Sequence, residues 1–92
     1  MKAIINAELV MRDHLIPEAV LFMEDGKIAG FGEMRTTAIP EGCEIIDAEG
    51  LYVGPGLVDI HMHMRGLSGP EYDIPTEAAC FPFGVTAAAD AG

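Results

Sequence analysis

The chain of 92 residues is 50% hydrophobic but only 7% aromatic, and its 11 glycines and 6 prolines favour short strands and turns over long helices. Fifteen acidic residues against five basic ones give a formal net charge of −10, which repels nucleic acid and anionic membrane surfaces and argues against both as partners. The length allows one domain at most, with a modest core, and no apolar run reaches the ~18 residues of a membrane span.

The first half of the chain predicts short strands. One strand is expected over Lys2 to Val10. Four apolar residues share one of its faces, Ala3, Ile5, Ala7 and Leu9, and the other face is only partly polar because it includes Ile4 and Val10. Pro17 then interrupts any helix. Two apolar runs, Ala19 to Met23 and Lys27 to Phe31, are joined around Asp25-Gly26, a dipeptide that accepts positive φ and closes tight hairpins.

A second pair of strands is expected after a polar loop at Thr36 to Gly42. The runs Glu44 to Asp47 and Leu51 to Val53 flank Glu49-Gly50, which could connect them. Up to Val53, the sequence therefore predicts a small antiparallel β unit of four or five strands with no helix.

The pattern changes after the turn at Gly54-Pro55-Gly56. The run Leu57 to His61 is apolar apart from Asp59, which is typical of a parallel strand buried on both faces. After a loop, Thr76 could cap a short helix over Glu77 to Phe81, which Pro82 and Gly84 would end. The run Val85 to Ala89 predicts a second buried strand, so this half of the chain spells one βαβ unit.

His61 and His63 stand at the C-terminal end of the first of these strands. Side chains two residues apart on a strand share a face, with Cα atoms roughly 6.5 Å apart, so both imidazoles can point at one ion. Zinc binds imidazole nitrogen, and α/β folds place ligands at the C-terminal ends of strands. The pair predicts half of a metal site, although the same spacing also occurs in surface histidines that bind nothing.

Three further residues near this strand are candidates for the site. Asp59 lies on the face of His61, one layer deeper, where its carboxylate either orients a metal-binding histidine or makes a structural hydrogen bond to the backbone. Arg65, in the loop Met64 to Pro75, either binds a substrate carboxylate or phosphate or is a solvated loop residue. Asp90, at the end of the second strand, either faces the site or forms a turn.

The residues Asp47 to His63, DAEGLYVGPGLVDIHMH, resemble the signature that opens the barrel of the amidohydrolase superfamily. The small β unit before them, and Gly84-Val85-Thr86 with Asp90-Ala91-Gly92 after them, are similar to the order in dihydroorotase-like and deacetylase-like members. The resemblance implies a mostly β N-terminal unit at 1–53, part of a β-sandwich. It implies that 54–92 form the first two strands, the first βαβ unit, of a TIM-like (β/α)8 barrel, an incomplete fold.

The resemblance also implies a function. The family hydrolyses a C–N bond of a small-molecule amide or cyclic amide, using a water activated by one or two divalent metal ions, with zinc expected first. His61 and His63 would be two ligands of that metal. The other ligands and the catalytic aspartate would lie beyond Gly92, so we expect no catalytic residue in this chain and only weak metal binding without turnover.

Two other interpretations stay open. The chain could be a catalytically inactive fragment or an oligomerising β module, because barrel strands without neighbours expose apolar faces and edges; we then expect a homo-oligomer. It could also be a simple metal-binding module, but His14, Cys43 and Cys80 stand at no recognisable ligand spacing from the histidine pair. Two distant cysteines and the absence of a signal-peptide pattern predict free thiols and a cytoplasmic protein.

Overall fold

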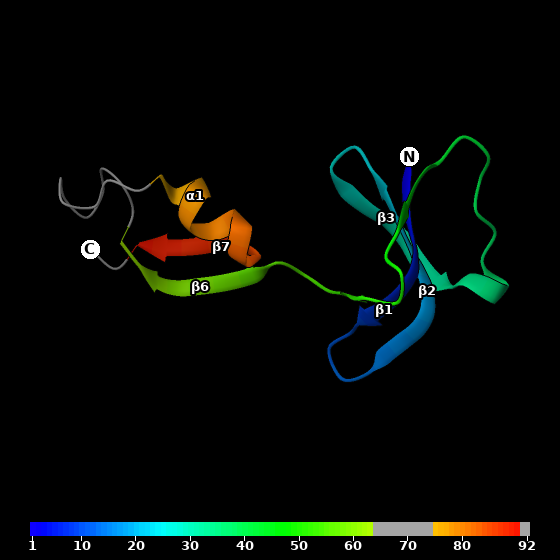
Figure 1. Cartoon of the computed structure of the whole chain (residues 1–92), viewed down its shortest axis with the longest axis horizontal. Helices are drawn as coiled ribbons and strands as arrows, with labels where there is room; N and C mark the ends of the chain where they lie inside the picture. Colours follow the sequence, from blue (N-terminus) through cyan, green and yellow to red (C-terminus); the bar gives the residue numbers. More distant parts are fainter. Residues whose placement is uncertain (64–74, 91–92) are drawn as a thin grey trace. The chain divides into compact units, whose positions relative to one another are not determined.

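The computed structural model describes residues 1–63 and 75–90. The chain does not form one core but divides into two compact units, Met1–Gly54 and Pro55–Gly92. The first contains a five-stranded sheet and the second a two-stranded sheet with one short α-helix (Figure 1). In the described ranges, no helix is long and apolar enough to cross a membrane.

The first unit is built on a three-stranded antiparallel meander. Strands β1 (Lys2–Val10), β2 (Leu15–Glu24) and β3 (Lys27–Glu33) pair in the order β3-β2-β1 (Figure 1). The β2–β3 hairpin is closed by Asp25 and Gly26, whose φ angles are 51° and 73°, and Glu24 pairs with Lys27 across it. Positive φ at both loop positions matches the twist of the flanking strands, and the predicted hairpin is confirmed.

The remaining strands of this unit run parallel to β1, so the prediction of an all-antiparallel sheet is wrong. A 3-10 turn (Met34–Thr36) and a loop lead to β4 (Glu44–Asp47) and β5 (Tyr52–Val53), which pair with successive parts of β1. The turn between them, closed by Leu51 N–H donating to the Ala48 carbonyl at 2.9 Å, does not pair β4 with β5. The backbone N–H groups of Ala48 and Gly50 instead donate to β1 carbonyls, which keeps the chain on that edge.

Two bulges divide the apolar residues of β1 between the two faces of the sheet. Between the pairs Ile4↔Leu21 and Ala7↔Ala19, β1 advances by three residues (4 to 7) and β2 by two (21 to 19), so the extra residue is on β1. Between Ala7↔Ala19 and Leu9↔Ile16, β1 advances by two residues and β2 by three, so the extra residue is on β2. An added residue reverses the alternation of side chains. The prediction that Ala3 shares a face with Ala7 and Leu9 is therefore wrong. One core cluster contains Ala3, Val20 and Phe22, and the other contains Ala7, Leu9, Ala19 and Ala48.

The second unit has the predicted strand, helix, strand order. Strands β6 (Leu57–Met62) and β7 (Val85–Asp90) pair in parallel, with α1 (Thr76–Cys80) and a 3-10 turn (Phe81–Phe83) before β7 (Figure 1). The prediction that Thr76 caps the helix is wrong, because Thr76 is its first residue and Pro75 holds the cap position without a side-chain hydrogen bond. Pro75 has φ −56° and ψ 139°, a non-helical backbone that the fixed φ of proline allows.

The strand β6 is exposed, although its apolar sequence predicts burial on both faces. Leu57, Val58 and Ile60 expose 61%, 67% and 82% of their surface. A strand is buried on both faces only when layers cover both, and two strands with one short helix cannot provide them. Of the described residues in this unit, Cys80 is the one that is buried, and its Sγ lies 3.7 Å from Sδ of Met62.

Candidate metal site

His61 and His63 lie side by side at the C-terminal end of β6. His61 belongs to the strand and His63 follows it directly, and both side chains are exposed. The two ring centroids are 5.7 Å apart and the ring planes are nearly perpendicular, at 87°. Imidazoles that each place a nitrogen about 2.0 to 2.1 Å from a shared ion can adopt such a separation. The geometry is therefore compatible with both rings binding one ion.

A local irregularity in β6 precedes the histidine pair. The pairing advances from Asp59↔Ala88 to Met62↔Asp90, which is three residues on β6 (59 to 62) against two on β7 (88 to 90). Within this stretch, the carboxylate Oδ1 of Asp59 accepts a hydrogen bond from the backbone N–H of His61 at 3.0 Å. The sequence leaves two roles open for Asp59, and the structure contains the hydrogen bond to the backbone.

Other potential ligands do not join the pair in the described part of the chain. Among residues 1–63 and 75–90, no three His, Cys, Asp or Glu side chains are grouped so that they could hold a metal ion. Cys43 and Cys80 are free thiols, as predicted. The imidazole Nδ1 of His14 lies 2.6 Å from Oδ1 of its neighbour Asp13, in an exposed position.

Of the two remaining candidates, Arg65 and Asp90, the described residues include Asp90. Arg65 lies outside the described residues, so its role in substrate binding stays a prediction. Asp90 is the last residue of β7 and pairs with Met62, which brings the C-terminal ends of both strands to the same edge of the sheet. Parallel strands present their C-terminal ends together, which is the arrangement that places ligand sites in α/β folds.

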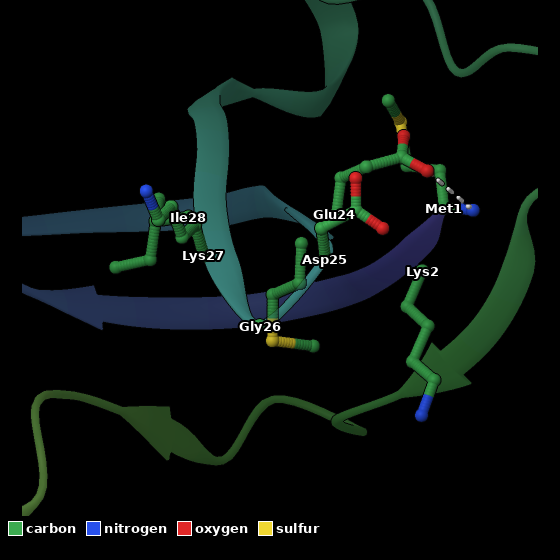
Figure 2. Close-up of a pocket in the computed structure, with 8 residues that line it drawn as sticks. Met1, Lys2, Glu24, Asp25, Gly26, Lys27 and Ile28 are labelled. Atoms are coloured by element: carbon green, nitrogen blue, oxygen red, sulfur yellow. Dashed lines mark ion pairs between the residues drawn. The ribbon is translucent and has the colours of Figure 1, made fainter.

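One hollow in the first unit, between the N-terminus and the β2–β3 hairpin, is not a candidate for this chemistry (Figure 2). Its volume is about 440 Å³, and the Met1 ammonium nitrogen lies 3.4 Å from Oε1 of Glu24 beside it. Lys2, Asp25 and Lys27 add charges of both signs to its lining. None of the residues around it is a histidine, a cysteine or any other predicted site residue.

The sequence reasoning missed the hydrogen-bonding role of Asp47. Its Oδ1 accepts from the backbone N–H of Glu49 at 2.8 Å and from Nδ2 of Asn6 at 3.1 Å. The bond from Glu49, and then the bond from Asn6, lower the pKa of the Asp47 carboxyl below its ordinary value. The signal that could have found it is an aspartate placed two residues before a turn, where its side chain can bond the following backbone.

Comparisons with known proteins give the class of the chain. No family model matches it. Imidazolonepropionase from Myxococcus xanthus is 37% identical over 70 residues, and dihydroorotase from Enterococcus faecalis is 38% identical over 66 residues; each alignment covers 71% of this chain. The solved structure of D-hydantoinase from Thermus sp. is 34% identical, with a TM-score of 0.54, over 70% of this chain.

The chain spans less than a fifth of the proteins it matches: 17% of the imidazolonepropionase, 15% of the dihydroorotase and 13% of the D-hydantoinase. Over this short region, the chain belongs to the amidohydrolase superfamily. In the part of the chain that the structure describes, the many strands and one short α-helix are consistent with the β-rich N-terminal unit of these enzymes.

Proposed function

We propose that this chain supplies the first two metal ligands of an amidohydrolase that cleaves a C–N bond of an amide or cyclic amide. The observation that carries the proposal is the contact of the His61 and His63 rings, with centroids 5.7 Å apart, at the end of β6. Neutral imidazole is a common ligand for divalent metals, and we expect zinc first. The relatives named dihydroorotase favour a cyclic amide as the substrate.

The site residues of this chain would hold and orient the ion. A bound divalent metal supplies an activated water and polarises the scissile carbonyl. His61 and His63 contribute one nitrogen lone pair each, so they must be neutral to bind and their protonation opposes binding. Two imidazoles are about half of the four ligands that zinc takes in proteins, so we expect weak binding by these 92 residues and no turnover.

The position of the pair fits the first strand of a barrel. In (β/α)8 barrels the catalytic groups lie at the C-terminal ends of the parallel strands. The proposal that these residues begin such a barrel is supported by the strand, helix, strand order and by the parallel pairing of β6 with β7. We infer that the first unit, with its five-stranded sheet, is part of the β-sandwich that accompanies the barrel. Free thiols at Cys43 and Cys80 agree with a cytoplasmic enzyme.

The proposal is tested by titrating the chain with Zn²⁺ in a calorimeter. We expect one equivalent to bind to the unaltered chain and none to the double variant His61→Ala, His63→Ala. The matched control is His14→Ala, which removes the third histidine from an exposed position in the other unit and should leave binding unchanged. Equal zinc binding by the double variant would contradict the proposed site, and hydrolysis of dihydroorotate by the 92-residue chain would contradict its predicted inactivity.

A further inference from the structure

The bulge in β6 creates a backbone group that needs a partner. Between the Asp59↔Ala88 and Met62↔Asp90 pairs, β6 contains one residue more than β7, so the regular ladder is interrupted around Ile60 and His61. At this interruption the N–H of His61 is bonded to a side chain of its own strand, Oδ1 of Asp59, at 3.0 Å. The carboxylate therefore stabilises the bulge at the residue that carries the first imidazole.

We propose that Asp59 is a positioning residue for the histidine pair: by accepting the His61 N–H, it fixes the bulge and so keeps the His61 ring beside that of His63. This inference rests on the proposed function, because the benefit of the arrangement is metal binding. His61 lies inside the interrupted stretch, where the ladder to β7 does not fix its backbone angles. Without the bond from its N–H to Asp59, the backbone at this point can adopt other angles, and the His61 ring is no longer held in one direction relative to His63.

The bond requires an acceptor oxygen, and it does not require a negative charge. The donor is a neutral backbone N–H, so an amide oxygen at position 59 can replace the carboxylate oxygen. A carboxylate that acted on the imidazole through its charge would lose its effect in Asp59→Asn. The two roles are therefore separated by one substitution: Asn preserves the backbone bond and removes the charge, whereas Ala removes both.

A matched control is present in the first unit. Asp47 makes the same kind of bond, from its Oδ1 to the backbone N–H two residues later, at 2.8 Å. Asp47→Ala thus removes an equivalent bond from the unit that does not contain the histidine pair. We expect that variant to leave the geometry and the metal affinity of the pair unchanged.

The experiment measures the full chain in two ways. In metal-free protein, NMR gives the contact between the His61 and His63 rings and the exchange rate of the His61 amide. Calorimetry and visible absorption then give the affinity for Co²⁺ as a spectroscopic substitute for zinc. We expect Asp59→Ala to lose the ring contact, to speed exchange of the His61 amide, and to bind Co²⁺ about 10-fold or more weakly. Asp59→Asn should keep the ring contact and bind within about 3-fold of the unaltered chain.

The possible results separate this inference from the proposed function. Equal Co²⁺ binding by the unaltered chain and Asp59→Ala, with loss in His61→Ala, would overturn the inference alone. Absence of Co²⁺ binding in the unaltered chain would contradict the proposed function, and with it the benefit assigned to Asp59. Asp59→Ala could also separate β6 from β7, and faster exchange of the Leu57 amide, which donates to the Gly84 carbonyl, would reveal this. In that case the result for Asp59→Asn tests the inference. A 10-fold loss in Asp59→Asn would assign the role to charge and overturn the proposal.

Discussion

The two units of the chain differ in how far their own residues bury one another. In the first, five strands enclose two core clusters, and Ala3, Ala7, Ala19 and Val20 are completely buried. In the second, the described residues include one buried side chain, Cys80, while the apolar residues of β6 face solvent. The candidate chemistry lies in the second unit. Stability and chemistry are therefore supplied by different parts of the chain, and substitutions should separate them.

The largest expected effect is on the stability of the first unit. Phe22 is 8% exposed and packs with Ala3 and Val20, so Phe22→Ala should reduce the free energy of unfolding by about 3 kcal/mol through lost burial and a new cavity. The control is Phe31→Ala on the adjacent strand, whose ring is 50% exposed and whose loss should cost under about 1 kcal/mol. Urea unfolding followed by circular dichroism measures both. Equal losses would show that the clusters do not form the core of this unit.

The second effect concerns association through the second unit. Ile60 is 82% exposed on β6, next to exposed Val58, and exposed apolar strands with open edges promote self-association. We expect a homo-oligomer at high concentration, and Ile60→Lys should weaken its association about 10-fold, because a charge at the contact must be desolvated. The matched control is Ile28→Lys, at a position 68% exposed in the first unit. Sedimentation equilibrium would contradict the prediction if the unaltered chain is monomeric or if both variants associate alike.

Local sequence signals predicted the elements better than they predicted the partners of those elements. Asp25-Gly26 specifies its hairpin, since both residues tolerate positive φ and the strands adjoin the turn. The parallel direction of β4 depends on β1, more than forty residues earlier in the sequence, and no local pattern encodes it. The bulges are harder to predict, because Glu18 is not a residue type enriched at left-handed φ angles, and Asn6, which is, stands within a run otherwise typical of a regular strand.

The candidate site was predictable to a similar extent. The two-residue spacing of His61 and His63 on an apolar strand predicted that the rings lie together, and the structure brings them into contact. The partner of Asp59 was left open, because a carboxylate two residues before a backbone amide can bond to it only where the ladder is interrupted, and that interruption depends on β7. Periodicity in one strand cannot reveal a register shift against another.

The smallest expected effect is a dependence of the first unit on pH. Hydrogen bonds from Glu49 and Asn6 lower the pKa of the Asp47 carboxyl, so its ionised form is favoured by folding. A lowered folded pKa gives stability that is present above the unfolded pKa, ordinarily 3.8, and is lost as the pH falls toward the folded value. The side chain is exposed, so solvent reduces the effect. Asp47→Asn should flatten the fall in unfolding temperature below pH 4 by a small margin, while Asp25→Asn, at the exposed hairpin turn, should leave it unchanged. If the unfolding temperature of the Asp47 variant and of the unaltered chain falls equally at acid pH, these two bonds do not lower the pKa of the Asp47 carboxyl on folding.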